Sequence, residues 1–416
     1  MLNIAILGFG SRGQMFANLA KNDDRVKLIA VAEPIELSRA RASEFGVSKD
    51  MQFTSAEEFF KKGKICDAVF ICTQDKQHYA QVIKAMELGY DVCLEKPAAT
   101  SIEDSVSIRD TANRLGRKVM LTHVLRYAPF YRCIKEVILS GALGDVVHID
   151  QTENVAYWHF GLSYVRGPWR SMADSTPTIM AKCCHDLDII NWLMDKKCES
   201  VSSFGALNYF KPDKAPVGSA EFCADCKEEI RENCVYNAYK VYNEYASRGV
   251  VGGLARVKGC SIDDIINKRE DPISKCVFHS NNDAVDVQTV NMRYNGGATA
   301  HLTMVAFSSE CHRRINVYGT QGEIFGDVEE NTLTLNVFGK ESKVIDVNEF
   351  SEGVDLDGGH GGGDTFLFRD FVEYLTTGKE SVTRTTIDQS IESHVMGFLA
   401  EESRLNNGKS IDLPTK

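Results

Sequence analysis

The sequence predicts an α/β protein with an N-terminal doubly wound parallel sheet, followed by a second α/β domain with a mostly antiparallel open sheet. Three observations predict this: a glycine turn that joins an apolar run to a helical pattern at the start, a regular alternation of such runs and patterns up to residue 122, and paired strand-like runs around Asn295-Gly296-Gly297. Because 416 residues exceed the size at which single cores usually stop growing, we expect two domains. We place them at residues 1–123 and 124–416, with a cysteine-containing insertion at about 209–280.

The first element is an apolar run, Asn3 to Leu7, which is short enough for a buried parallel strand. A glycine turn follows it and leads into a helical pattern, which is the arrangement that binds the pyrophosphate of a dinucleotide at a helix N-terminus. The candidate cofactor-binding residues of this turn are Gly8, Phe9, Gly10, Ser11, Arg12 and Gly13.

The second strand, Lys27 to Ala32, ends at Glu33, twenty residues after Gly13. An acid at this position accepts the hydroxyls of the adenosine ribose. A ribose phosphate at ~4 Å from the carboxylate would be repelled by about 4 kcal/mol at an effective dielectric near 20, so the sequence predicts NAD rather than NADP.

The alternation then continues to the end of the first domain. The predicted strands are 68–72, 91–94 and 118–122, and the predicted helices are 80–88 and 101–115. Ligands of such sheets bind outside the carboxyl ends of the strands. This rule places five further residues beside the cofactor: Thr73, Gln74, His78, Glu95 and Lys96.

With the glycine turn, the segments "CTQDKQH" at Cys72 and "EKP" at Glu95 make the chain resemble the glucose-fructose oxidoreductase / inositol dehydrogenase / MocA family. The resemblance continues through "HVLRYAPFY", "GALGDVVHI", "GPWR" and "CCHDLD". It implies a Rossmann domain and a second α/β domain that carries the substrate pocket and often mediates oligomerisation, so a homo-oligomer, dimer or tetramer, is expected. It also implies that Lys96 is an active-site lysine, that His185 is the acid/base histidine, and that Trp169 and Arg170 lie near the nicotinamide.

The second domain has its own strand signals. Asn295-Gly296-Gly297 separates two strand-like runs, 284–294 and 298–306, as expected for an antiparallel pair. Further predicted elements are the strands 199–207, 315–317, 323–325 and 333–337 and the helices 365–375 and 387–405.

The stretch AKCCHDLDII combines two cysteines, a histidine and two acids. Apolar residues recur at helical spacing from Ile179 to Met194, so Cys183 and His185 are about 200° apart around a helix and cannot easily share a metal ion. We therefore interpret Cys183 as a core residue and His185 as a base in the cleft, with Lys182 one turn before it. Many members of the family carry an aspartate four residues before this histidine, where this chain has Ala181. Asp186 or Asp188 would then have to orient the ring.

The insertion contains CADCKEEIRENC, which brings Cys223, Cys226 and Cys234 close together in sequence. In a reducing compartment this spacing suggests structural zinc, with Cys184 or Cys198 as candidates for a fourth ligand. An iron–sulfur cluster and unliganded thiols remain alternatives, and a redox disulfide pair is less favoured because no strand–helix context frames the motif.

Other candidate substrate contacts come from a glycine-rich loop and two aromatic segments. DGGHGGGD reads as a loop with His360 at its tip, and similar loops occur in NAD-dependent glycosidases of this fold. Aromatic rings with polar tips suit sugars and cyclitols, although core aromatics would look much the same. The substrate-binding candidates are Arg126, Tyr127, Tyr157, His159, Lys182, Asp186 and His360.

The charge balance points to a small-molecule partner. The chain has 47 Lys and Arg against 58 Asp and Glu, a net charge of -11 and a pI of about 5.5, which argues against nucleic acid. The chain contains no run of about 20 apolar residues that could span a membrane. The opening MLNIAILGFG has no basic start or cleavage site, so we expect a cytoplasmic protein.

The leading hypothesis is an NAD-dependent oxidoreductase that takes hydride from a secondary hydroxyl of a sugar, glycoside or cyclitol, with Lys96 and His185 handling the proton. One alternative is an NAD-dependent glycosidase that works by transient oxidation, elimination, hydration and re-reduction. A second alternative is a cofactor-bound sensor without turnover.

Overall fold

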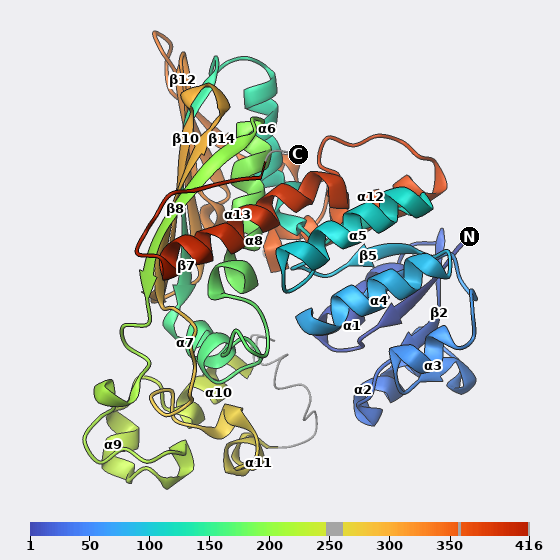
Figure 1. Ribbon diagram of the computed structural model, residues 1–416, viewed down its shortest axis with the longest axis vertical. Coiled ribbons are helices and arrows are strands. Elements are labelled where there is room, and N and C mark those ends of the chain that lie inside the picture. Colours follow the sequence, from blue (N-terminus) through green and yellow to red (C-terminus); the bar gives the residue numbers. More distant parts are fainter. Residues whose placement is uncertain (247–260, 357–358, 415–416) are drawn as a thin grey trace.

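The computed structural model describes residues 1–246, 261–356 and 359–414, and it contains two sheets. Figure 1 shows the first sheet, in blue, beside the second sheet, whose strands run from green to orange. The first sheet is parallel and the second is mostly antiparallel, which confirms the predicted fold class.

The first sheet has the strand order β3-β2-β1-β4-β5-β6, the order of the doubly wound dinucleotide-binding fold. The order reverses between β1 and β4, so a crevice opens at the carboxyl ends of these two strands. The strands are β1 Leu2–Leu7, β2 Val26–Ala32, β3 Gln52–Phe53, β4 Ala68–Ile71, β5 Asp91–Leu94 and β6 Val119–Leu121. The helices are α1 Ser11–Lys21, α2 Glu36–Ala40, α3 Ala56–Phe60, α4 Asp75–Glu87 and α5 Ile102–Leu115.

Local sequence explains where these elements begin and end. Both faces of the strand β1 are buried, with Ile4 and Ile6 on one face and Ala5 and Leu7 on the other, because helices cover both sides of the sheet. The helix α5 begins after Ser101, whose hydroxyl accepts the N–H of Asp104, and it ends at Gly116, which adopts a left-handed conformation with φ 61°.

The second sheet has nine strands in the order β14-β13-β12-β11-β7-β10-β9-β8-β15. The pair β7 and β10 is parallel, and the other pairs are antiparallel. The strands are β7 Val146–Ala156, β8 Cys198–Ala206, β9 Val287–Tyr294, β10 Thr299–Ser308, β11 His312–Gly319, β12 Gly322–Asp327, β13 Thr332–Val337, β14 Lys343–Asp346 and β15 Ile411–Asp412.

The remaining helices cover one face of this sheet, join it to the first sheet, or belong to the segment between β8 and β9. They are α6 Pro129–Leu139, α7 Tyr157–Phe160, α8 Thr178–Met194, α9 Glu228–Asn233, α10 Ala238–Ala246, α11 Ile262–Asn267, α12 Gly363–Thr376 and α13 Ile387–Leu405. The helices α9, α10 and α11 lie together below the second sheet in Figure 1.

The C-terminal helices fasten the two sheets together. The helix α13 packs against α8 and β8 on one side and α5 on the other (Figure 1). The helix α12 places Phe368 and Phe371 in the core of the first sheet, against Phe70. Chain from the second half of the protein therefore contributes to the core of the first sheet.

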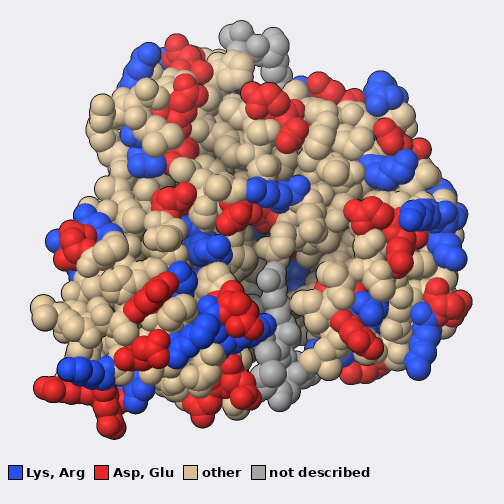
Figure 2. All heavy atoms as spheres, turned by 60° about the horizontal axis from the view of Figure 1, so that its bottom comes forward, with Lys and Arg blue, Asp and Glu red and all other residues tan. Residues whose placement is uncertain are grey.

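The face of the molecule that Figure 2 shows carries interspersed basic and acidic side chains. None of the described helices is both long enough and apolar enough to cross a bilayer. The expected homo-oligomer stays a prediction.

Candidate active site

The glycine turn fits a dinucleotide because each glycine meets a different steric demand. A Cβ on Gly8 would lie 2.5 Å from Cys72 O, and one on Gly13 would lie 2.1 Å from Gly8 O, so both positions exclude larger residues. A Cβ on Gly10 would meet no atom within 4 Å, which leaves the backbone open to a ligand. Gly10 is also the N-cap of α1 and provides no side-chain cap, so the helix N-terminus, which begins at Ser11, can receive an anion.

Glu33 lies at the end of β2, beside the glycine turn. Its carboxylate accepts the backbone N–H of Phe9 at 2.7 Å and that of Ile35 at 3.0 Å. The side chain is thus held at the position from which an acid binds the adenosine ribose in this fold. The turn and Glu33 together fit NAD.

Ion pairs of Arg12 connect the glycine turn to the second half of the protein. Arg12 Nε donates to Glu95 Oε1 at 2.6 Å, and Arg12 Nη2 lies 2.7 Å from Asp364 Oδ1. Glu95 also accepts the hydroxyl hydrogen of Thr122 at 2.8 Å. These contacts fix Glu95 and the adjacent Lys96 at the carboxyl end of β5.

His78, Thr73 and Gln74 form the turn that follows β4. The buried His78 ring places Nδ1 2.7 Å from Pro97 O and Nε2 3.1 Å from Thr73 O. Gln74 is the N-cap of α4, and Thr73 Oγ1 donates to Gln81 at 2.8 Å. Both nitrogens of His78 face backbone oxygens, so this histidine holds the turn after β4 against Pro97. Its contact with the cofactor stays a prediction.

Lys96 reaches across the crevice to the helix α8. Its Nζ donates to the backbone oxygen of Ala181 at 2.9 Å. Residue 181 is an alanine without a side-chain acid, and its backbone carbonyl accepts the hydrogen bond from the lysine. Among the described residues, Lys96 forms no ion pair, because the acids of this region pair with other cations.

His185 lies on α8, one turn after Ala181, and is almost fully buried. Its two ring nitrogens have no hydrogen-bond partner among the described residues. Burial, and then the positive charge of Lys96, lower the pKa of His185 well below its ordinary value, with smaller contributions from His360 and His123. The ring is therefore neutral near pH 7 and can accept a proton.

Neither candidate acid orients the His185 ring. Arg126 donates to Asp188 through two nitrogens, both at 2.6 Å, and His123 Nδ1 lies 2.9 Å from the same carboxylate. Asp186 accepts from Gln151 at 2.5 Å and from Arg313 at 3.0 Å. The expectation that one of these acids orients the ring is wrong, because among the described residues neither nitrogen of His185 has a hydrogen-bond partner.

The glycine-rich loop brings a second histidine to the site. The ring centroid of His360 lies 5.5 Å from that of His185, and His360 Nδ1 lies 2.9 Å from Asp364 Oδ2. Burial raises the pKa of Asp364, but Arg12 and His360 outweigh it and hold the pKa below its ordinary value. The His360–Asp364 pair thus stands next to His185, and the acid of this pair is the last residue of DGGHGGGD.

His159, Trp169 and Lys182 form the opposite wall of the site. The Tyr164 ring lies between the rings of His159 and Trp169, at centroid distances of 5.9 Å and 5.8 Å. Burial, and then the charges of Lys182, Lys96 and Arg313, lower the pKa of His159 to about 3. The ring of Tyr157 contacts Tyr236 instead.

The segment after Trp169 touches the cofactor domain. Arg170 Nη2 donates to Asp174 at 3.5 Å, and Ser175 Oγ donates to Asp75 at 2.7 Å at the start of α4. The segment therefore lies over the carboxyl edge of the first sheet, where the resemblance places Trp169 and Arg170.

Comparison with known proteins agrees with this geometry. A family described as "Oxidoreductase family, NAD-binding Rossmann fold" matches residues 2–123, and "Oxidoreductase family, C-terminal alpha/beta domain" matches residues 135–413. The chain belongs to the Gfo/Idh/MocA oxidoreductase family. The resemblance predicted from the sequence is thereby confirmed, and so is the NAD-binding Rossmann domain.

Curated relatives of this Gfo/Idh/MocA protein differ in activity. It is 28% identical to the oxidoreductase YteT of Bacillus subtilis (strain 168) over 77% of this chain and 74% of YteT. It is 28% identical to the scyllo-inositol 2-dehydrogenase (NAD(+)) of the same organism, over 52% of this chain and 66% of that enzyme. The 2,7-anhydro-N-acetylneuraminate hydratase of Mediterraneibacter gnavus is 26% identical over 48% of this chain and 51% of that enzyme.

Solved structures share the fold of this family member. An inositol dehydrogenase homolog from Azotobacter vinelandii, complexed with NADH and myo-inositol, has a TM-score of 0.68 at 16% identity over 99% of this chain and 97% of that one. The WlbA dehydrogenase from Bordetella pertussis, in complex with NADH and UDP-GlcNAcA, has a TM-score of 0.71 at 15% identity over 100% and 98%. At these identities the likeness shows the fold alone.

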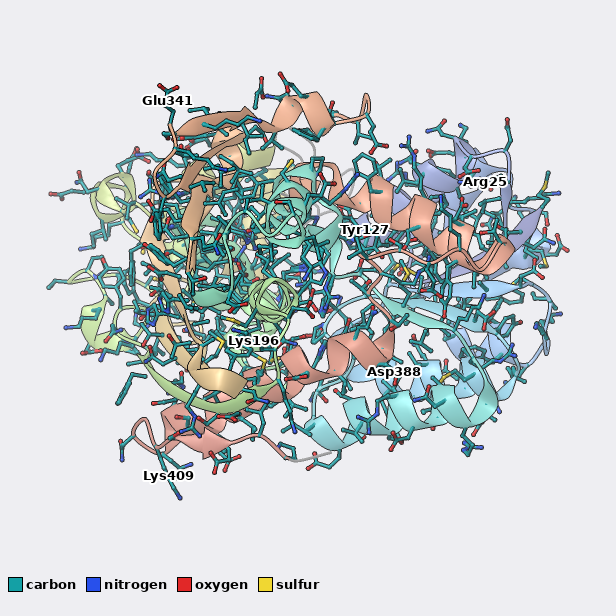
Figure 3. The ribbon with its side chains drawn as sticks, turned by 90° about the horizontal axis from the view of Figure 1, so that it is seen from above. Arg25, Tyr127, Lys196, Glu341, Asp388 and Lys409 are labelled. Carbon is teal, nitrogen blue, oxygen red and sulfur yellow. The ribbon has the colours of Figure 1, made fainter. Side chains whose placement is uncertain are left out.

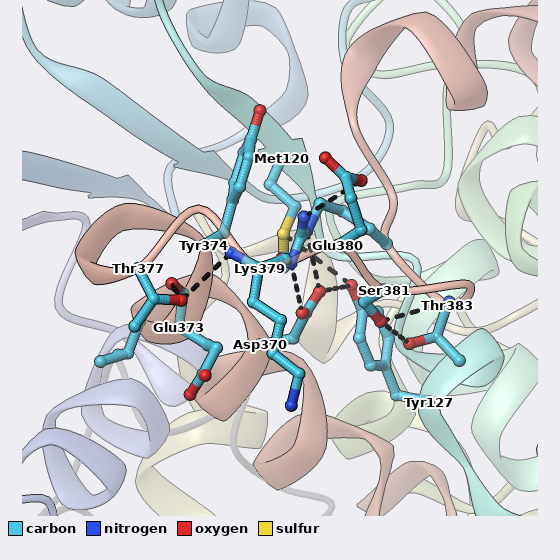
Figure 4. A network of polar contacts seen from close by, with 12 residues as sticks. Met120, Tyr127, Asp370, Glu373, Tyr374, Thr377, Lys379, Glu380, Ser381 and Thr383 are labelled. Carbon is cyan, nitrogen blue, oxygen red and sulfur yellow. Dashed lines mark hydrogen bonds and ion pairs between the residues drawn. The ribbon is translucent and has the colours of Figure 1, made fainter.

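Two predicted substrate contacts of the Gfo/Idh/MocA chain have structural partners instead. Arg126 is buried against Asp188, and the hydroxyl of Tyr127 donates to Asp370 at 2.9 Å. Figure 3 places Tyr127 between the two halves of the molecule, and Figure 4 shows it beside Asp370. A cavity of about 430 Å³ on this side is lined by Tyr127, Trp192 and Phe366 among others, and it contains none of the residues around His185.

The cysteines of the insertion lie near one another. Cys223 and Cys226 flank the short turn Cys223–Asp225. Burial raises the pKa of Cys234, and the neighbouring Cys223 and Cys226 add to the rise. Cys276, which the sequence analysis did not single out, lies near Cys226 and Cys234, and its pKa is raised to about 11, chiefly by burial.

The predicted zinc site gains no support from this arrangement. Cys184 lies in α8 near Lys96, and Cys198 begins β8, where its Sγ contacts Ser200 O at 3.8 Å, so neither is placed as a fourth ligand. Over residues 1–246, 261–356 and 359–414, no three His, Cys, Asp or Glu side chains are arranged to hold a metal ion.

Proposed function

We propose that this protein is an NAD-dependent oxidoreductase that takes hydride from a secondary hydroxyl of a sugar, glycoside or cyclitol. The observation that carries the proposal is the pairing of Lys96 with His185: an ammonium and an unpartnered neutral imidazole meet at the carboxyl edge of the cofactor sheet. Relatives that include a scyllo-inositol dehydrogenase support the choice of substrate class.

The proton chemistry follows from the two side chains. A bound nicotinamide would supply the hydride acceptor. Lys96 donates a hydrogen bond to the substrate oxygen and stabilises the negative charge that grows on it. His185 accepts the hydroxyl proton, and its depressed pKa keeps it in the accepting form. The partly exposed His360–Asp364 pair lies beside His185.

A second candidate function is a glycosidase that oxidises a ring carbon, eliminates the aglycone, adds water and returns the hydride. The observation that favours it is the His360–Asp364 pair beside His185, combined with an alanine at position 181. Elimination needs a group that removes a carbon-bound proton and one that protonates the leaving group, so a second histidine at the site has a role there.

One assay separates these functions. The purified protein is incubated with NAD and a panel of sugars, cyclitols and aryl glycosides, and reduced cofactor and released aglycone are followed together. NADH in proportion to substrate supports the dehydrogenase. Aglycone without net NADH supports the glycosidase. If no substrate of the panel gives either product, both enzymatic proposals are contradicted, and a cofactor-bound sensor without turnover is the hypothesis that remains.

Cofactor choice is tested at Glu33. We expect Glu33→Ala to raise the KM for NAD and to reduce the preference for NAD over NADP by at least about 10-fold, because the carboxylate that repels a ribose phosphate by about 4 kcal/mol is removed. The measurement is kcat/KM with each cofactor. Glu36→Ala, which removes an exposed acid three residues further on, is the matched control. An unchanged preference in Glu33→Ala would contradict the assignment.

A further inference from the structure

Four charged side chains form a cluster beside His159 and His185. Lys182 Nζ lies 3.0 Å from Glu153 Oε1, and Arg313 Nε lies 2.5 Å from Glu153 Oε2. Arg313 Nε also donates to Asp186 Oδ1 at 3.0 Å. The cluster joins β7, α8 and β11, and only Lys182 and Asp186 were singled out in the sequence.

The cluster is layered, with its acids inside and its bases outside. The side chains of Glu153 and Asp186 are 1% and 0% exposed, whereas those of Lys182 and Arg313 are 12% and 13% exposed. A ligand that enters the site therefore meets the ammonium and the guanidinium first. Arg313 contacts both Glu153 and Asp186 through Nε. Its two terminal Nη atoms can therefore bind the two oxygens of a further carboxylate.

A third cation faces the same space. The Nζ of Lys96 bonds to the backbone oxygen of Ala181, directly before Lys182, rather than to an acid. The His159 ring feels all three cations, which, after burial, account for the lowering of its pKa. Three cations therefore lie close enough to this part of the site to act on the same ring.

We propose that Lys182 and Arg313 bind a carboxylate of the substrate, so that the substrate is an acidic sugar, such as a uronic acid or its glycoside, rather than a neutral sugar or cyclitol. This inference rests on the proposed function. The carboxylate seats against the outer cations, and the ring then presents a secondary hydroxyl to Lys96 and His185.

The first test changes the substrate and leaves the protein intact. Holoenzyme with NAD is given matched pairs: galactose and galacturonate, glucose and glucuronate, each acid also as its methyl ester, and the corresponding 6-phosphates. We expect kcat/KM to be about 10- to 100-fold higher for the free acids than for the neutral sugars and the esters, because a hydrogen-bonded charge pair is lost in those. Equal or better turnover of the neutral partners, or a preference for the phosphates, would overturn the inference.

The second test changes the protein. Arg313→Gln should raise the KM for the acid more than about 10-fold with little change for a neutral sugar, and Arg313→Lys should recover part of the loss. Lys182→Met is combined with Glu153→Gln so that the buried charge stays balanced. Arg314→Gln, on the same strand but 67% exposed, is the matched control and should behave like wild type. An equal loss for acid and neutral substrates in Arg313→Gln would indicate a purely structural role.

A binding measurement separates this inference from the proposed function. Titration calorimetry with galacturonate and with galactose reports recognition without turnover. Acid binding that is lost in Arg313→Gln, without NADH from any substrate, would sustain the anion site and contradict the oxidoreductase. NADH from neutral sugars only would sustain the oxidoreductase and contradict the anion site.

Discussion

We expect the His185→Gln variant to lose about 10²- to 10⁴-fold in kcat with a fold that is unchanged, because a general base contributes about that factor. Glutamine keeps a polar side chain of similar reach but cannot take the hydroxyl proton. Since the two ring nitrogens of His185 have no hydrogen-bond partner among the described residues, the substitution breaks no native contact of this kind. Steady-state kinetics and a thermal unfolding curve of the same preparation check the two parts of this expectation.

The pH dependence of activity tests the same assignment of His185 as the base. Only neutral His185 accepts a proton, and burial and Lys96 hold its pKa well below its ordinary value. Activity of the wild type should therefore persist as the pH falls below about 6.5, the ordinary histidine value. Lys96→Gln removes the nearest positive charge, so the acid limb of its residual activity should move to higher pH. A limb that stays in place in Lys96→Gln, or a His185→Gln variant with nearly full activity, would rule out the assigned base.

We expect the Arg126→Met variant to lose about 3–5 kcal/mol of stability, the cost of leaving one partner of a buried ion pair alone. Arg126 and Asp188 are buried, and two hydrogen bonds of 2.6 Å join them. Without the guanidinium, the Asp188 carboxylate keeps only the His123 ring, whose Nδ1 lies 2.9 Å away, from the ion-pair contacts of this site. Chemical denaturation of both proteins gives the difference in the free energy of unfolding.

Two further variants show whether the loss belongs to the buried pair. Arg126→Met combined with Asp188→Leu removes both charges and should recover most of the stability, because a buried pair can often be replaced by apolar residues at little cost. Arg25→Met breaks an exposed ion pair with Asp23 and should change the stability by less than about 1 kcal/mol. Equal losses in Arg25→Met and Arg126→Met would show that the burial of the Arg126 pair has no special effect.

The second sheet shows where sequence patterns become insufficient. The strand β7 lies at the centre of that sheet, between β11 and β10, yet the sequence analysis noted part of it only as a motif of the resemblance. Its buried face carries Gln151 and Glu153 among apolar residues, so the period-two alternation that identifies a strand is interrupted. The buried polar residues are there because Lys182, Arg313 and Asp186 meet them from other elements.

Helical spacing, by contrast, placed Cys183 in the core, where it is fully buried. The glycine turn, the strand after it and the acid at position 33 could also be identified from the sequence, because their roles depend on neighbours within about thirty residues. The sequence by itself therefore determined the cofactor fold, the family and the pair of residues proposed for the proton.

Only the tertiary structure decided which group each ionisable side chain serves. Asp188 pairs with Arg126, 62 residues away, Asp364 pairs with Arg12, and His78 contacts two backbone oxygens. Such pairings depend on distances of about 3 Å between segments that are remote in sequence, and burial magnifies the consequence of each. Local composition does not carry that information, which is why the surroundings of His185 and the two cations beside Glu153 could be identified only from the folded structure.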